Sequence, residues 1–485
     1  MTTSIGVEVT TSVSSGPSNA GVQSGRLHVG GLTEKGPISG STVIDSIAKY
    51  LAVYGDRTAY SSNMFDTVRL FFEEGGAEVV VSRVVGPGAS VGNLTLVDSA
   101  GVPTIRVEAN DPGAHSAGFS VEVTSSGAST FDVVIRRAGE IVSRYLALTS
   151  PAELVAKAAT NPFVKVTSLG STTAAPGDNP AARVVTPLSA GNDDRANVTA
   201  ARVVDALDKG TGAEGGVVAA PGYTADQIGV LLAGHAKAKR KIALTAPALN
   251  ATAAEAATSA AALMADPNGD SIGLFYPHLI VPDGGATRTI SPEGYVAAVR
   301  AKAHRDTGFW QVPAGDRART RWVIGTVTPV DEDLNNELAE TFVNGITTTG
   351  TKTRLYGWAS LAADREGLGL LTARDALNNL TSSIRTVLEP FIFSVNDDTG
   401  HLRAYVESAI VGILDPIAKR GGFYSLRDAE NQPIDPGYRV SVDTSLNTVT
   451  LQAENKLLVS VAVRLSPTAQ LIQVEIIKVP LVGTV

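Results

Sequence analysis

The stretch FFEEGGAEVVVSRV, from Phe71 to Val84, decides the fold class of this chain. Its first half ends a helix that we expect over Met64 to Glu74, because Gly75 and Gly76 permit the left-handed backbone with which many helices close. Its second half enters a continuous apolar run, Val79 to Val81, which is typical of a strand buried on both faces of a parallel sheet. A helix that leads into such a strand predicts an α/β fold.

The same alternation continues on both sides of this stretch. Further strands are expected at 27–31, 216–220, 242–246 and 272–276, and further helices at 45–54, 194–208, 224–238 and 251–265. Strands and helices at this spacing predict a mainly parallel sheet that is covered by helices. We assign residues 22–90 together with 188–333 to this α/β domain.

Two regions do not follow this alternation of strands and helices. Between residues 91 and 187, short β-prone runs are separated by Gly, Ser, Asn and Asp, which predicts an inserted β-rich domain. Residues 334–469 are expected to form an α+β C-terminal module. Its long helix ends at Glu389-Pro390, because proline cannot continue a helix, and one helical face carries Leu377, Leu380, Ile384, Leu388 and Phe391.

Both ends of the chain alternate apolar and polar residues, as a half-buried strand does. The N-terminal arm, residues 1–21, joins such a strand to a Gly/Ser/Pro-rich tether, and the C-terminal arm, residues 470–485, mirrors it. A further strand over Leu457 to Leu465 alternates in the same way. The apolar faces of these three strands consist of Ile5, Val7 and Val9; Ile472, Val474 and Ile476; and Val459, Val461 and Val463. Each arm is therefore able to pair with another strand.

Composition excludes several classes of function. The net charge is −8, and the one basic run, Lys237 to Lys241, reads as a solvated turn, so nucleic acid is not an expected partner. The absence of cysteine excludes thiolate catalysis, disulfides and cysteine-based metal sites. No apolar run reaches the ~18 residues that span a bilayer. The start of the chain has no signal-peptide pattern, so we expect a protein made in the cytoplasm without membrane insertion.

Two motifs suggest an enzyme but occur in the wrong context. GDSIG, Gly269 to Gly273, matches the nucleophile elbow of α/β-hydrolases, yet an expected helix precedes it and a strand follows it, which reverses the order of the elbow. GTGAEG, Gly210 to Gly215, matches a dinucleotide fingerprint but follows a helix instead of a strand. The six histidines have no metal-ligand spacing, and acidic pairs such as Asp193-Asp194 suit capping and turn roles. We therefore expect no catalytic, cofactor or metal site; a hydrolase that uses Ser271 remains the enzymatic alternative.

Several segments, in order, resemble the tail sheath proteins of contractile phages, which are related to the sheaths of phage-tail-like bacteriocins and contractile injection systems. The resemblance covers residues 20–90 and 190–485 and skips the insert. Its segments are GLTEKGP (31–37), FFEEGGAEVVVSRV (71–84), GLFYPHLIVPD (273–283), SPEGYVAAVRAKAHRDTGFWQVPAG (291–315), LNNELAETFVNGI (334–346), YGWASL (356–361), VLEPFIF (387–393) and IQVEIIKVP (472–480).

This resemblance implies a structural subunit of a contractile sheath. Such a subunit polymerises with its own copies as a helical sleeve around a tail tube, joins baseplate and tail terminator proteins, and resides in the tail of a virion or tail-like particle after assembly in the host cytoplasm. The arms of such sheaths add strands to neighbouring subunits, so the nine apolar arm and C-terminal residues named above become expected intersubunit pairing residues. Another virion structural protein, such as a tube or capsid component, remains the non-enzymatic alternative.

Overall fold

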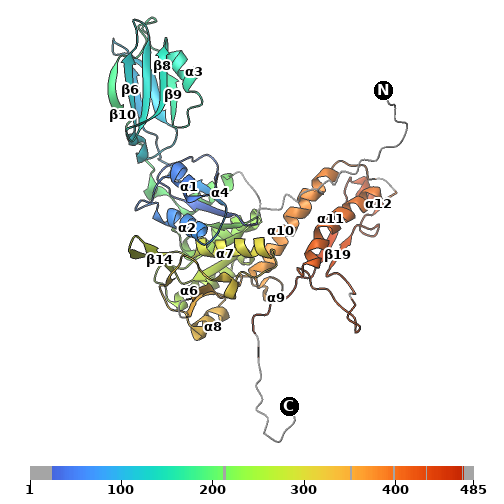
Figure 1. Cartoon of the computed structure of the whole chain (residues 1–485). Helices are drawn as coiled ribbons and strands as arrows, with labels where there is room; N and C mark the ends of the chain where they lie inside the picture. Colours follow the sequence, from blue (N-terminus) through green and yellow to red (C-terminus); the bar gives the residue numbers. More distant parts are fainter. Residues whose placement is uncertain are drawn as a thin grey trace, which may run out of the picture. The chain divides into compact units, whose positions relative to one another are not determined.

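A computed structural model describes residues 24–210, 215–349, 352–396, 399–432, 434–471 and 473. These residues form two compact units: a body unit, Gly25–Asn378, and a C-terminal unit made of the described residues from Asn379 onward together with Ser24 (Figure 1). Helices and several separate sheets alternate along the chain. The predicted mixed α/β fold is confirmed.

An eight-stranded sheet runs through the body unit. Its central strands pair in parallel, from β3 through β1, β11, β12 and β13 to β17, and the outer strands β2 and β18 are antiparallel to their neighbours. In spatial order the strands are β18 (Lys352–Leu355), β17 (Asn344–Thr349), β13 (Ile272–Tyr276), β12 (Ile242–Thr245), β11 (Val217–Ala219), β1 (Leu27–Gly31), β3 (Val79–Arg83) and β2 (Thr42–Ile44).

Helices cover both faces of this sheet. Along β12, Ile242 and Leu244 join the apolar core on one face, whereas Ala243 joins the core on the other, as the two-residue period of a strand requires. The first core receives side chains from α1 (Ile47–Tyr54), α2 (Ser62–Glu73) and α7 (Glu293–Asp306). The second receives them from α4 (Ala200–Lys209), α5 (Ala225–Ala238), α6 (Ala253–Met264) and α8 (Glu332–Glu340).

The stretch from Phe71 to Val84 has the helix end that its two glycines predict. Helix α2 ends at Glu73, and Gly75 follows with a left-handed φ of 97°. The Gly76 N–H donates to Phe71 O at 2.8 Å and the Gly75 N–H donates to Phe72 O at 3.0 Å, which is the Schellman pattern. The chain then enters β3, all of whose residues are buried.

The region between β3 and α4 contains a sandwich of two sheets, which we call the insert. One core holds side chains from both sheets and from α3 (Pro151–Ala158). The three-stranded sheet contains β4 (Asn93–Val97), β5 (Pro103–Ala109) and β9 (Val164–Ser168); the four-stranded sheet contains β10 (Arg183–Pro187), β6 (Phe119–Ser125), β7 (Phe131–Arg137) and β8 (Glu140–Leu148). A further small sheet, outside the insert, contains β15 (Ala286–Ile290), β14 (Leu279–Asp283) and β16 (Gly325–Thr326).

Two sequence expectations need correction. Residues 334–378 belong to the body unit instead of a C-terminal module, because β17 pairs in parallel with β13, with Asn344 opposite Phe275. The helix expected from residue 194 starts only at Ala200, because Asp194 adopts a left-handed backbone and the Thr199 side chain caps α4.

Helix α10 (Leu371–Leu388) begins in the body unit and ends in the C-terminal unit. Asp375 binds Arg300 of α7 through two hydrogen bonds, of 2.9 and 2.5 Å, and both side chains are buried. Asn378 donates to Lys241 O at 3.2 Å. Leu377, which was expected on the apolar face, is 41% exposed, because the buried face of this half of the helix is mixed and includes the polar residues Asp375 and Asn378.

Candidate assembly interface

The C-terminal unit contains a sheet of only two strands in its described part. Strand β19 (Tyr438–Ser441) pairs antiparallel with β20 (Ser460–Val463), with Tyr438 opposite Val463. The connection between them includes α12 (Val449–Ala453), and α11 (His401–Lys419) precedes both strands. A two-stranded sheet is marginally stable alone, so this unit is a candidate acceptor of further strands.

One edge of β20 is occupied. The Arg464 N–H donates to Gly437 O at 2.8 Å, and just beyond it the Ser466 N–H donates to Gly422 O at 3.2 Å, on the same side of the strand. Backbone groups alternate between the two edges along an antiparallel strand. Ser460 and Ala462 therefore direct their N–H and C=O groups toward β19, as Arg464 does.

The opposite edge of β20 is open. By the same alternation, the N–H and C=O groups of Val461 and Val463 point away from β19, and no strand of the described chain pairs with them. Their side chains are half-buried, whereas Ser460 and Ala462 between them are exposed. An exposed strand edge with an apolar face is a template for another strand.

Several large apolar side chains of the C-terminal unit are exposed to solvent. Phe393 is fully exposed, with a relative accessibility of 102%, and it has a left-handed φ of 66°. The exposed large apolar residues of this unit are Ile392, Phe393, Val395, Tyr405, Tyr424, Leu426, Ile434, Val449, Leu458 and Leu471.

The loop into β20 is nevertheless well fixed. Asn447 is buried; its side-chain nitrogen donates to Leu458 O at 2.9 Å, and its oxygen accepts from the Leu458 N–H at 2.7 Å. At the other end of β20, Arg464 contacts Asp435 at 3.1 Å. The Gly437 N–H, which donates to Asp435, holds the pKa of that carboxyl below its usual value. The open edge is thus presented by a defined strand.

Three of the nine predicted pairing residues can be placed. Val461 and Val463 lie in β20, and Val459 immediately precedes it and is half-buried. The other six, Ile5, Val7, Val9, Ile472, Val474 and Ile476, lie outside the described residues. Their pairing with β20 stays a prediction.

The GDSIG motif forms no nucleophile elbow. Gly269–Ser271 is a 3-10 turn that leads into β13, after α6. Ser271 is fully buried, and its hydroxyl lies 3.2 Å from the neighbouring carboxylate of Asp270. Asp270 in turn pairs with Arg374 and Lys237. This arrangement gives the serine a structural position without access for a substrate.

The other chemical motifs are also structural where they can be described. The GTGAEG stretch joins α4 to β11, as its context predicted, and residues 211–214 lie outside the described chain. His235 binds Asp208 at 3.0 Å, and His304 lies 3.4 Å from Asp375. No group of three metal-ligating side chains occurs in the described ranges. None of the helices in those ranges is long and apolar enough to cross a bilayer.

Sequence reasoning missed a buried ion pair at the junction of body and insert. The Arg83 guanidinium donates to the Asp193 carboxylate at 2.5 Å, and both side chains are inaccessible to solvent. Asp193 was expected in a turn, a role that its neighbour Asp194 fills by accepting from the Gly88 N–H at 2.7 Å. The available signal was an arginine at the end of a valine-rich strand.

Comparison with known proteins adds a fold relationship. No family model matches the chain, and no curated protein matches its sequence. Among solved structures, a sheath tail protein of Listeria innocua is similar with a TM-score of 0.61 and 13% identity, over 87% of this chain and 89% of that one. A sheath tail protein of Desulfitobacterium hafniense gives a TM-score of 0.58 and 12% identity, over 90% and 94%.

A third structure comes from an assembled particle. The helical sheath of the anti-feeding prophage in its contracted state gives a TM-score of 0.57 and 14% identity, over 98% of this chain and 99% of that one. The similarity thus extends over nearly the full length of both chains, so it includes the insert and the C-terminal unit. This chain has the fold of the contractile tail sheath proteins.

Proposed function

We propose that this protein is the structural subunit of a contractile sheath. It polymerises as a helical sleeve around a tail tube and contracts from a metastable extended state to drive the tube through a cell envelope. The observation that carries the proposal is the open edge of β20 in a two-stranded sheet, within a chain that has a sheath fold over nearly its full length.

Strand exchange explains how such a sleeve stays connected. The arms at residues 1–21 and 470–485 would add strands to the sheets of neighbouring copies, with Ile5, Val7, Val9, Ile472, Val474 and Ile476 facing the apolar side of β20. An added strand makes about four to six backbone hydrogen bonds, each worth a net ~1 kcal/mol. The Gly/Ser/Pro tether can bend while these bonds persist, so bodies can rotate without leaving the array.

Contraction then requires no nucleotide. In the extended array, contacts between bodies would be suboptimal, and reorientation from the baseplate end would bury more surface between them. The C-terminal unit would face the tube and the insert would lie outward. The tube, baseplate and terminator proteins are the proposed partners, in the tail of a virion or a tail-like particle assembled in the host cytoplasm.

Negative-stain microscopy of the purified chain tests this function. Sleeves or rings are expected, and deletion of residues 1–15 should abolish them while circular dichroism stays unchanged. Monodisperse monomers of the full chain that form no sleeve over a wide range of concentration and ionic strength would refute the proposal. The enzymatic alternative predicts ester hydrolysis that is lost in Ser271→Ala.

A further inference from the structure

The insert is joined to the rest of the body unit by two chain segments that lie side by side. Ser90 and Asn192 exchange backbone hydrogen bonds of 2.8 and 2.9 Å, and the Gly86 N–H donates to Asp193 O at 2.8 Å. Arg83 stabilises this junction, because its guanidinium donates to Gly36 O at 2.6 Å and to Pro112 O of the insert at 2.8 Å, in addition to Asp193. The junction is therefore a fixed joint.

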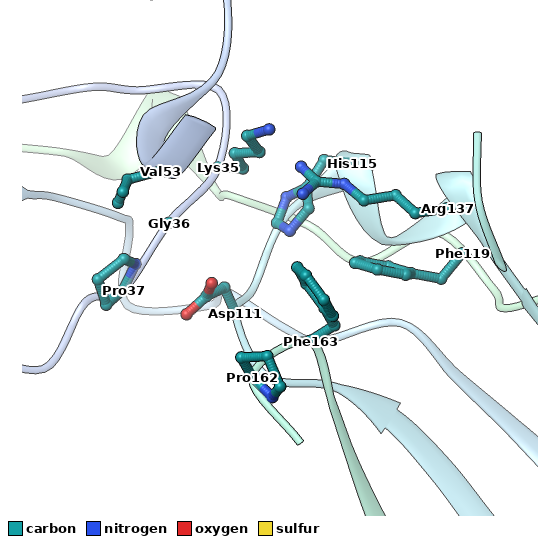
Figure 2. Close-up of a pocket in the computed structure, with 10 residues that line it drawn as sticks. All are labelled: Lys35, Gly36, Pro37, Val53, Asp111, His115, Phe119, Arg137, Pro162 and Phe163. Carbon is teal, nitrogen blue, oxygen red and sulfur yellow. The ribbon is translucent and has the colours of Figure 1, made fainter. Parts of the chain in front are cut away.

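A cavity of about 160 Å³ lies beside this joint, between the β1–β2 loop and the insert. Figure 2 shows Lys35 on the loop side and Arg137, His115, Phe119 and Phe163 on the insert side. A cavity of about 150 Å³ holds a molecule the size of benzene. The space therefore suits a small ligand.

Two cations from different parts of the body unit line this cavity. The Arg137 guanidinium lies over the rings of Phe119 and Phe163, 5.5 and 5.9 Å from their centroids. Burial lowers the pKa of Lys35, and the nearby charge of Arg137 lowers it further. The carboxylates that act electrostatically on these two cations are Glu34, for Lys35, and Asp111, for Arg137.

The remaining titratable groups at the cavity leave it positive. Burial raises the pKa of Asp111, while Arg83 and Arg137 oppose that change. Burial lowers the pKa of His115 to about 4, so this imidazole is neutral at pH 7, and its buried Nδ1 has no hydrogen-bond partner among the described residues. Glu34 contributes only a minor attraction to Lys35. By residue type the lining holds two basic side chains, Lys35 and Arg137, and one acidic side chain, Asp111, so its formal charge is positive.

We propose that this cavity binds a small oxyanion, a phosphate or a carboxylate, between Lys35 of the β1–β2 loop and Arg137 of the insert. The anion neutralises the repulsion between the two cations, and His115 Nδ1 supplies a neutral hydrogen-bond donor beside them. Because the two cations come from opposite sides of the joint, a bound oxyanion fastens the insert to the rest of the body unit. This site is independent of sleeve formation.

Isothermal titration of the full chain with inorganic phosphate and with acetate, at an ionic strength held constant with chloride, tests the site. The variants Lys35→Gln and Arg137→Gln should each weaken binding by about tenfold or more, as the loss of one charged hydrogen bond requires. Asp111→Asn should tighten binding. Arg136→Gln is the matched control, because Arg136 neighbours Arg137 but pairs with Glu122 at 2.9 Å.

An NMR titration supplies a second measurement, since the ring resonances of His115, assigned with a His115→Asn variant, should shift on addition of either anion. Lys35 is only half-buried, so Lys35→Gln should fold even if Arg137→Gln does not. The proposal is overturned if neither anion binds the wild-type chain at 10-fold molar excess over a ~1 mM protein sample, or if Lys35→Gln binds as tightly as the wild type.

Discussion

Replacing Val461 and Val463 with proline tests whether the open edge of β20 binds neighbouring copies. Proline lacks the N–H group, and it is tolerated on an edge strand whose N–H faces away from the ladder. Both N–H groups face away from β19, so the pairing of β19 with β20 should survive. Two intermolecular hydrogen bonds are lost, which costs about 2 kcal/mol per subunit contact.

A loss of this size raises the critical concentration for sleeve formation by at least roughly 30-fold. Pelleting at a series of protein concentrations, followed by negative-stain microscopy, measures this critical concentration. The double variant Val461→Thr with Val463→Thr is the control, because it changes the same side chains but keeps both N–H groups, and its critical concentration should stay within about threefold of the wild type. Proline and wild-type chains that polymerise at equal concentrations would show that this edge does not accept a strand.

Three further predictions concern the arms and the interior. Val474→Asp with Ile476→Asp should abolish sleeves without changing the circular dichroism spectrum, and normal polymerisation of this variant would rule out the C-terminal arm. Asp375→Asn removes the buried carboxylate that pairs with Arg300, so it should destabilise the body unit by about 3–5 kcal/mol in urea unfolding followed by tryptophan fluorescence. Asp316→Asn, at an exposed pair, should have a much smaller effect, and equal effects of the two variants would contradict this account. Burial raises the pKa of Glu293 to about 7, so the folded state holds this proton more tightly than the unfolded state. The free energy of unfolding of the wild type, relative to that of Glu293→Gln, should therefore fall by ~3 kcal/mol as the pH rises from about 4.5 to 7. Parallel pH profiles of the two unfolding free energies would refute this prediction.

Local sequence signals predicted the regular elements of the body unit well. The glycine pair after α2, and in the C-terminal unit the alternating face of β20, depend on a few adjacent residues, so their structure can be read from those residues alone. The capping box at Thr252 and Glu255, which starts α6, is equally local.

Long-range partners could not be predicted from such signals. The pairing of β17 with β13 joins residues about seventy positions apart, and the sequence of neither strand identifies the strand with which it pairs. The same holds for Arg83, whose buried carboxylate partner Asp193 is 110 residues away. Leu377 was misplaced because its helix buries Asp375 and Asn378, two polar side chains whose partners lie in other elements. The missed parts of the fold and of the joint thus depend on contacts between distant segments.

The adjacent segments at Ser90 and Asn192 have a consequence for evolution and for engineering. Since the chain leaves and rejoins the body at neighbouring points, any domain with closely spaced ends can replace residues 91–187 without moving the eight-stranded sheet. The insert can therefore diversify while the eight-stranded sheet stays constant. A fluorescent protein or an enzyme could be grafted between these two points, once in each chain.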